Sequence, residues 1–327
     1  MTLDDQDVHL TSPYTDTGYQ YKVQLHAHTT RSDGSHDPQW VMQAYGIIGY
    51  AAVAITDHDY RERTTPTLDD PGGHAIVHIP GVEYSANAAD GSWRHMLGIL
   101  IGSIHHADGW DARQSQIHRT SAEAGLSFLC HPYGEQVHPR GWTTDACLDL
   151  QGYSGMEIYN GASCGQAEIL ACFEPAVDRM LVSGRRLLLI ATDDFHTDMD
   201  LGYVVINSPA PPQALVLDDV ARALRDGNFF AVGRMDPEAA LAPHFTDIRV
   251  EGRTLTVTVD QPADIEFVTA RHHAASAGGT CSQRDTGVSG ACYTVVPQDR
   301  FVRVRGTVNH GGHEAHAWSN PIYVQAR

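Results

Sequence analysis

Lysine is nearly absent from this 327-residue chain: Lys22 is the only one, beside 21 arginines, and the formal net charge is −18. Nucleic-acid binding draws most of its affinity from basic surface, so this balance disfavours a nucleic-acid partner. No apolar run approaches the roughly 20 residues that span a bilayer, which disfavours a membrane partner. The acidic surface by itself predicts only solubility.

Other signals are missing as well. The acidic start, Met1 to Asp5, lacks the basic and apolar regions of a signal peptide, so we expect a cytoplasmic protein. The six cysteines include no C-x-x-C pair, and no Cys-His-Asn pattern surrounds Cys130, so we expect reduced core residues and no nucleophile. Cys281 and Cys292 could face each other across a loop. The sequence leaves the oligomeric state open.

Short apolar runs alternate with helical patterns over the first two-thirds of the chain, which is typical of repeated β/α units. The expected strands are residues 21–25, 51–55, 76–79, 95–100, 126–129, 156–159 and 186–191. The expected helices are residues 38–48, 110–124 and 167–181, the last interrupted near Pro175. After about Val232 the pattern changes to alternating runs, such as 254–259 and 301–305, which predict antiparallel strands. Residues 272–290, rich in small and polar side chains, are expected to form a mobile hairpin loop.

Histidines and carboxylates recur at the ends of the expected strands. His26-Ala27-His28 follows the first one, and the two-residue period of a strand places both imidazoles on one face. Imidazole suits borderline divalent metals such as Zn, Fe and Mn, and carboxylates can bridge two ions. The clusters therefore predict one polynuclear metal site in a metal-dependent hydrolase, built from His26, His28, Asp33, His58, Glu83, His95, His131, Asp194 and His196.

This ordered set resembles the polymerase-and-histidinol-phosphatase (PHP) superfamily over about residues 20–235. The tail Ala-Trp-Ser-Asn-Pro-Ile-Tyr at 317–323 is similar to the CehA/McbA-like branch of that superfamily. The resemblance implies an α/β fold with a distorted seven-stranded β/α barrel at 20–238, after an N-terminal segment at 1–19. We interpret residues 239–327 as a small appended β-sandwich.

The resemblance also implies a trinuclear centre that holds two to three divalent ions (Zn, Mn or Fe). The first metal would take His26, His28, Glu83 and Asp194; the second would share Glu83 as a bridge and add His95 and His131; the third would take Asp33, His58 and His196. His95 is preferred to His105 and His106, because it lies 12 residues after Glu83 and opens an apolar strand.

The charge of such a centre predicts the substrate. Three ions, partly balanced by three carboxylates and a bridging hydroxide, leave about two positive charges, which favours an anion with several oxygens. We therefore expect a phosphoesterase for a small-molecule phosphate monoester or cyclic diester, in which water bridging two metals attacks phosphorus.

The expected roles around that centre differ in kind. Glu83 and Asp194 are the candidate catalytic metal ligands. The candidate substrate contacts are Arg31, Arg94 and His138, the last as proton donor to the leaving group; an ordinary ion pair is the alternative for each arginine. Three further aspartates are expected to orient ligands or to cap helices: Asp57, Asp59 and Asp193.

Two other function classes stay open. The same centre could hydrolyse a carboxyl ester or an aryl carbamate, in which case the attacked atom is carbon. Alternatively, the chain could be a non-enzymatic metal-binding scaffold whose β-sandwich recognises a protein or a glycan.

Overall fold

The computed structural model describes residues 8–15, 18–59, 68–69, 75–85, 94–105, 110–132, 141–163, 173–234, 241–271 and 279–326. The helices are α1 (Pro38–Ile47), α2 (Trp110–Ala122), α3 (Thr144–Asp149), α4 (Glu174–Val182) and α5 (Leu217–Asp226), with short 3-10 turns at Gly161–Ser163 and Pro212–Ala214. None of these helices in the described ranges has the length and apolar character needed to cross a membrane.

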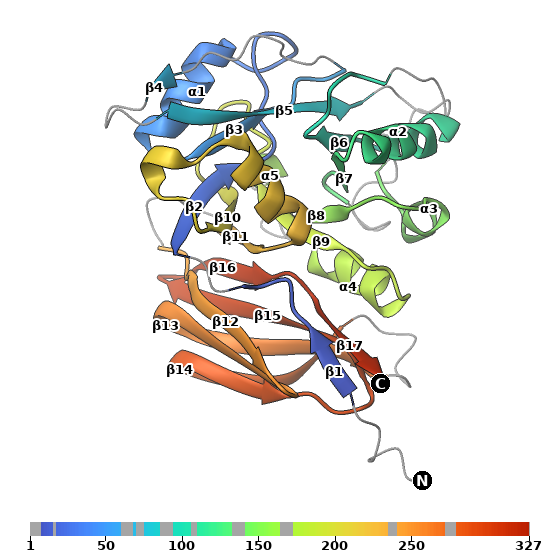
Figure 1. Ribbon diagram of the computed structural model, residues 1–327, viewed down its shortest axis with the longest axis vertical. Coiled ribbons are helices and arrows are strands. Elements are labelled where there is room, and N and C mark those ends of the chain that lie inside the picture. The colour runs from blue at the N-terminus through green and yellow to red at the C-terminus, as the bar shows by residue number, and fades with distance from the viewer. Residues whose placement is uncertain are drawn as a thin grey trace.

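The first part of the chain contributes β1 (Val8–Thr11), β2 (Tyr19–Gln24), β3 (Ala52–Ile55), β4 (Leu68–Asp69), β5 (Ala75–Tyr84), β6 (Met96–Ile99), β7 (Leu126–Leu129), β8 (Gly155–Asn160), β9 (Leu188–Thr192), β10 (Gly202–Ser208) and β11 (Phe229–Arg234). The remaining strands are β12 (Phe245–Glu251), β13 (Thr254–Arg271), β14 (Thr280–Thr294), β15 (Asp299–His310), β16 (His313–Ser319) and β17 (Ile322–Ala326). The fold is thus mixed α/β and rich in strands (Figure 1).

Seven strands follow one another in the order β2-β3-β5-β6-β7-β8-β9. Every residue of β3, β6, β7 and β8 is buried, which explains why these strands appear in the sequence as continuous apolar runs. Neighbours pair in parallel except at β6, which is antiparallel to both β5 and β7. The start of β6 therefore lies at the same edge as the carboxyl ends of the adjoining strands.

The segments after β2 and β9 meet at that edge. Ala27 and Phe195 form a parallel bridge, in which the His28 amide donates to the Phe195 carbonyl at 3.0 Å. β10 pairs antiparallel with β2 on one side and with β11 on the other. The bridge brings the first and last predicted ligand clusters together, although about 170 residues separate them in the sequence.

The C-terminal strands are joined to this sheet. β11 pairs antiparallel with β16, from Phe230 opposite Ser319 to Arg234 opposite Ala315. β12 to β17 pair antiparallel, and β1 from the N-terminal segment pairs with β17, so the two lie side by side (Figure 1). One hydrophobic cluster includes Val41 of α1 and Phe267 of β13. The C-terminal strands thus share a core with the rest of the chain.

A buried ionic network fastens α4 to these strands. Arg303 of β15 donates from Nε to Asp178 Oδ1 at 2.8 Å and from Nη2 to Glu174 Oε2 at 2.6 Å. Arg305 and the indole of Trp318 also donate to Glu174 Oε1, at 2.7 and 2.9 Å. Burial alone would raise the pKa of Glu174, but Arg303 and Arg305 outweigh it and lower the pKa to about 2.

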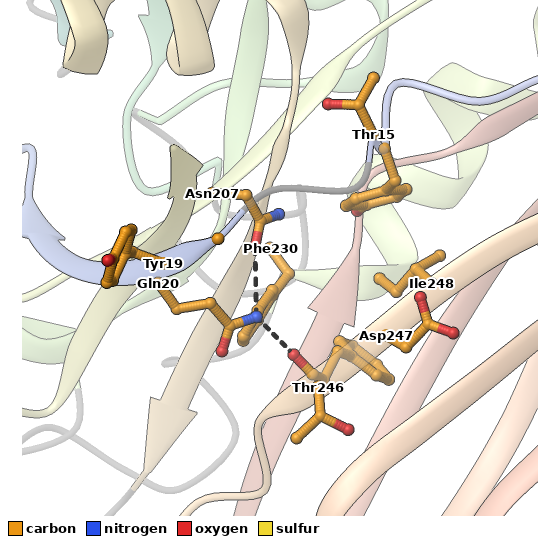
Figure 2. Close-up of a pocket in the computed structure, with 11 residues that line it drawn as sticks. Thr15, Tyr19, Gln20, Asn207, Phe230, Thr246, Asp247 and Ile248 are labelled. Atoms are coloured by element: carbon orange, nitrogen blue, oxygen red, sulfur yellow. Dashed lines mark hydrogen bonds between the residues drawn. The ribbon is translucent and has the colours of Figure 1, made fainter. Parts of the chain in front are cut away.

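A second junction lies at the start of β2, the end remote from His26. Gln20 Nε2 donates to Asn207 Oδ1 at 3.2 Å and to the Phe245 carbonyl at 2.8 Å, and so links β2 and β10 to β12 (Figure 2). A mostly polar cleft of about 190 Å³ surrounds this amide, with Tyr19 and Asp247 in its lining (Figure 2). The hydrogen bonds give the Gln20 amide a structural role between the two sets of strands.

Three local expectations can be compared with the structure. Residues 280–290 are strand β14 and not loop, because their backbone pairs with β13; residues 272–278 lie outside the described ranges. Cys281 and Cys292, which pair with Val268 and Thr256 of β13, are free cysteines, so they form no disulfide with each other. The expected helix at 167–181 is described only from Glu174, where α4 begins with Pro175 in its first turn, a position that tolerates proline; residues 167–172 lie outside the described ranges.

Candidate metal centre

The nine predicted ligands lie at or next to the ends of six strands, and their side chains meet in one cluster. His26 and His28 follow β2, His58 follows β3, Glu83 is near the end of β5, and His95 directly precedes β6. The other four members come from the loop after β2, the end of β7 and the end of β9: Asp33, His131, Asp194 and His196. Because β6 runs antiparallel, a histidine at its start reaches the same edge as those at the ends of the parallel strands.

Four donors at the centre of the cluster are spaced as ligands of one ion would be. His26 Nε2 lies 3.2 Å from His28 Nε2 and 3.2 Å from Asp194 Oδ1, and His28 Nε2 lies 3.1 Å from that same oxygen. Glu83 Oε2 is 3.4 and 3.2 Å from the two imidazole nitrogens. Donors about 2.0–2.2 Å from a tetrahedral zinc ion would themselves be roughly 3.3 Å apart.

One of these atoms has no other partner within the described ranges. Asp194 Oδ1 is buried and accepts no hydrogen bond there, although two imidazole nitrogens lie within 3.2 Å of it. A buried carboxylate oxygen without a donor is costly. The four residues, His26, His28, Glu83 and Asp194, therefore fit a divalent ion, which would satisfy this oxygen.

Glu83 is placed to bridge two ligand sets. Its Oε2 faces His26, His28 and His58, the last through Nδ1 at 3.0 Å. Its Oε1 faces His95 Nδ1 at 3.0 Å and His131 Nε2 at 3.4 Å. The two oxygens of the buried Glu83 carboxylate thus contact different groups of imidazoles, as the oxygens of a bridging ligand do.

A third set lies at the exposed side of the cluster. Asp33 Oδ2 is 3.4 Å from His58 Nε2 and 3.4 Å from His196 Nε2, and Asp33 Oδ1 is 3.4 Å from His28 Nδ1. His58 presents its other nitrogen to Glu83, so it stands between the second and third sets. Two histidines thus lie near more than one ligand set. His28 lies near the third set as well as the first, and His58 lies near the second set as well as the third.

The electrostatics of the cluster favour positive charge. Burial alone would lower the pKa of His26, but Asp194 and Glu83 outweigh it and raise that pKa well above its usual value. The same two carboxylates raise the pKa of His28 to about 9 against the effect of burial. The His95 and His26 imidazoles in turn hold the pKa of Glu83 well below its usual value, although burial opposes them. A site with this field attracts a proton or a metal cation.

Two of the predicted ligands adopt a strained backbone. His131 has φ of 32° and Asp194 has φ of 50°, in the left-handed region that few non-glycine residues occupy. Such strain persists only where the surroundings hold it in place. The His131 amide donates to Glu157, and Asp194 Oδ2 accepts from Asn160 at 3.2 Å.

Glu157 was missed by the sequence analysis. It is fully buried in β8 and accepts from His26 Nδ1 at 2.8 Å and from Thr192 Oγ1 at 2.6 Å. This hydrogen bond fixes the tautomer in which His26 Nε2 is free to bind a metal. A single acidic residue inside the apolar strand Gly155–Asn160 was the signal that could have revealed it.

Replacing Glu157 with glutamine is expected to weaken metal affinity by about 10- to 100-fold, because such supporting partners usually contribute that much. The measurement is competition for Zn²⁺ against a chromogenic chelator. Glu251→Gln, on an exposed side chain of β12, is the matched control and should leave the affinity unchanged. Equal affinity in both variants would show that Glu157 does not support His26.

The neighbouring aspartates organise loops. Asp57 accepts from the Thr29 amide, the Thr29 hydroxyl and the Ser32 hydroxyl, all at 2.7 Å, and Ser32 Oγ lies 3.3 Å from His28 Nδ1. Asp57 therefore orients His28 through Ser32. Asp59 accepts from the Ser85 hydroxyl at 2.7 Å. Asp193 accepts from Tyr45 and from the backbone amides of residues 200–202, and so holds the segment after His196.

His105, His106 and Cys130 are the other potential ligands near the cluster in the sequence or in space. His105 is buried, and its Nε2 lies 3.3 Å from Glu123, so it belongs to another contact; His106 lies outside the described ranges. The Cys130 sulfur lies within reach of both Glu83 and His131. Burial and the nearby carboxylates raise the pKa of the Cys130 thiol well above its usual value.

The predicted substrate contacts occupy different places. Arg31 is exposed on the loop between His28 and Asp33, and its amide donates to Thr29 Oγ1 at 3.2 Å. Arg94 donates from Nε to the Gly141 carbonyl at 3.4 Å. His138 lies outside the described ranges.

Two curated relatives match part of the chain. The 5′-3′ exoribonuclease Rnm of Escherichia coli (strain K12) is 33% identical over 93 residues, and that of Salmonella typhimurium (strain LT2) is 33% identical over 95 residues. Each match covers 28% of this chain and about a third of the relative, 31% and 32%. No protein-family model matches the chain.

A solved structure resembles the whole chain in fold. It is a two-domain protein from Bacteroides vulgatus ATCC 8482 that contains a predicted PHP-like metal-dependent phosphoesterase. The TM-score is 0.52, at 17% identity, over 97% of this chain and 98% of the other. This is a likeness in fold, and the CehA/McbA-like branch stays a prediction.

Proposed function

We propose that this protein is a PHP-type metal-dependent hydrolase and that it acts as a phosphoesterase on small phosphate monoesters or cyclic phosphodiesters. The observation that carries the proposal is the spacing of 3.1 to 3.4 Å among the donors of His26, His28, Glu83 and Asp194. The strand order from β2 to β9, with the bridge of Ala27 to Phe195, supports a distorted seven-stranded barrel that presents them. We interpret β12 to β17 as the C-terminal sandwich.

Bound divalent ions would supply a hydroxide nucleophile near neutral pH and positive charge for the phosphoryl oxygens. The chain's own residues would hold these ions and orient their ligands. Glu83 links the first ligand set to His95 and His131, Glu157 fixes the tautomer of His26, and Arg31, exposed on the adjacent loop, is the candidate phosphate contact.

Glu157 modifies the charge argument for the substrate. It adds a fourth carboxylate to Asp33, Glu83 and Asp194, so three ions and a hydroxide would leave about one positive charge rather than two. An anionic substrate is still favoured over a neutral ester or carbamate, although by less. The names of the two partial relatives also support cleavage of a phosphate ester bond.

The test is phosphate release by the Mn²⁺-loaded chain from a panel of sugar, nucleotide and amino-alcohol phosphates. Turnover that is lost on chelation and restored by Mn²⁺ is the expected result. Aryl acetates and aryl carbamates form a second arm, and activity there alone would move the reaction to carbon. A 5′-phosphorylated oligoribonucleotide forms a third arm, which the net charge of −18 predicts to be a poor substrate. Inactivity across all arms, with metals bound, would favour the scaffold alternative.

A further inference from the structure

Two aromatic rings are stacked at the start of α1. The ring centroids of His36 and Trp40 are 3.6 Å apart and their planes differ by 18°. Trp40 lies in the first turn of the helix, where its amide donates to the N-cap Asp37 at 3.0 Å. Trp40 is 40% exposed, which is unusual for a residue that normally buries most of its surface.

Two chain segments that carry predicted ligands at the exposed side of the metal cluster also contact the stacked pair. The Thr30 amide donates to the His36 carbonyl at 2.8 Å, on the loop that carries Asp33. The Phe195 ring, whose centroid is 6.4 Å from that of Trp40, stands in the sequence between the ligands Asp194 and His196.

The exposure of the ligands shows which side of the cluster is open. The side chains of Asp33 and His196 are 53% and 35% exposed, whereas those of His26 and His28 are fully buried. Asp33 and His196 are thus the most exposed of the nine candidate ligands, and solvent reaches the cluster there. These are the two ligands whose chain segments also hold the stacked pair.

We infer that Trp40, backed by His36, is a stacking platform for a planar aromatic group of the substrate whose anionic head binds at the metal cluster. The inference rests on the proposed function and names its substrate class: aryl or nucleobase-bearing phosphates. His36 holds the indole in place, so little side-chain freedom is lost when a ring stacks on its other face. Exposure alone does not define such a platform. Ile47, at the far end of α1, is 67% exposed but carries no ring that could stack.

The test compares two ligands of similar size that differ in planarity. Phenylphosphonate and cyclohexylphosphonate are titrated calorimetrically into the full chain with Mn²⁺ in excess. The planar ligand should bind roughly 3- to 10-fold more tightly, the range expected of one aromatic stacking contact. Trp40→Leu should abolish this preference, and Trp40→Phe should retain part of it. Ile47→Ala, on the same helix, is the matched control and should keep it in full.

The outcomes separate the platform from the metal centre. Equal affinity for both phosphonates, or a preference that survives Trp40→Leu, would overturn the platform and leave the centre standing. Binding of neither would overturn both. Thermal unfolding checks that Trp40→Leu is folded, and Trp40→Phe keeps the comparison available if it is not. AMP against ribose 5-phosphate distinguishes the two sources of the ring: a preference for AMP identifies a nucleobase, and its absence beside a phenyl preference identifies a simple aryl group.

Discussion

Glu83→Gln is expected to reduce hydrolysis about 10³-fold and to lower the metal content by more than one ion per chain. Five imidazole nitrogens lie within 3.4 Å of the Glu83 carboxylate, and its two oxygens address different imidazoles. An amide has no charge and offers one acceptor oxygen, so it cannot serve both sides. A bound metal contributes several kcal/mol of transition-state stabilisation, and a loss of about 4 kcal/mol corresponds to roughly 10³-fold in rate.

Metal content by mass spectrometry and phosphate release on the same sample provide the two measurements. Glu251→Gln makes the same chemical change on a side chain that is 77% exposed, and both quantities should stay at the wild-type level. If Glu83→Gln keeps its metals and its turnover, Glu83 is not a bridging ligand. If it keeps its metals and loses turnover alone, the carboxylate acts on the substrate.

Arg303→Met is expected to lower the free energy of unfolding by about 3–5 kcal/mol, because it leaves the buried Asp178 without the arginine that it pairs with and leaves Glu174 with Arg305 alone. The Arg303 side chain is 1% exposed and donates to both Glu174 and Asp178. Urea unfolding followed by circular dichroism measures the loss. Arg249→Met, on a side chain that is 54% exposed, removes an arginine from a surface pair and should cost less than about 1 kcal/mol.

A rescue experiment separates lost charge pairing from lost packing. Neutralising both partners in Arg303→Met/Glu174→Gln/Asp178→Asn should restore a large part of the stability, since no unpaired charge then remains. A triple variant as unstable as Arg303→Met would show that packing of the arginine, and not its charge, stabilises the junction.

The pH dependence provides a second view of the same network. The pKa of Glu174 is lowered from 4.5 to about 2, so the unfolded chain takes up its proton first as the pH falls. The stability that Glu174 contributes is thus fully present above about pH 4.5 and is lost progressively toward pH 2. The stability difference between wild type and Glu174→Gln should shrink over this interval, and a constant difference would contradict the pairing.

Much of the strand pattern could be anticipated, because burial on both faces produces continuous apolar runs. The expected strand at 126–129 matches β7, and the expected helix at 38–48 matches α1 within one residue. The loop expected at 272–290 was wrong over 280–290, since β14 is largely exposed and its polar sequence carries no apolar alternation. Strand pairing with β13, which is not visible in local composition, determines that segment.

The candidate metal centre, like the strand pattern, could be anticipated only in part from the sequence. Its nine donors could be named from the sequence because a ligand's chemistry belongs to its residue type and because His26-Ala27-His28 uses the local period of a strand. Whether those nine are ligands awaits the metal measurements. Their spacing, the two-sided role of Glu83 and the support from Glu157 arise only when strands distant in sequence come together.

Residue type and short-range periodicity are enough to identify the side chains that are available for metal chemistry and the positions of the buried strands. The tertiary structure decided the rest. The reversed direction of β6 brings His95 to the common edge, and the bridge between Ala27 and Phe195 joins the two ends of the ligand set. The position of Trp40 beside that edge was also settled by packing. These are contacts between segments far apart in the chain, and no local pattern encodes them.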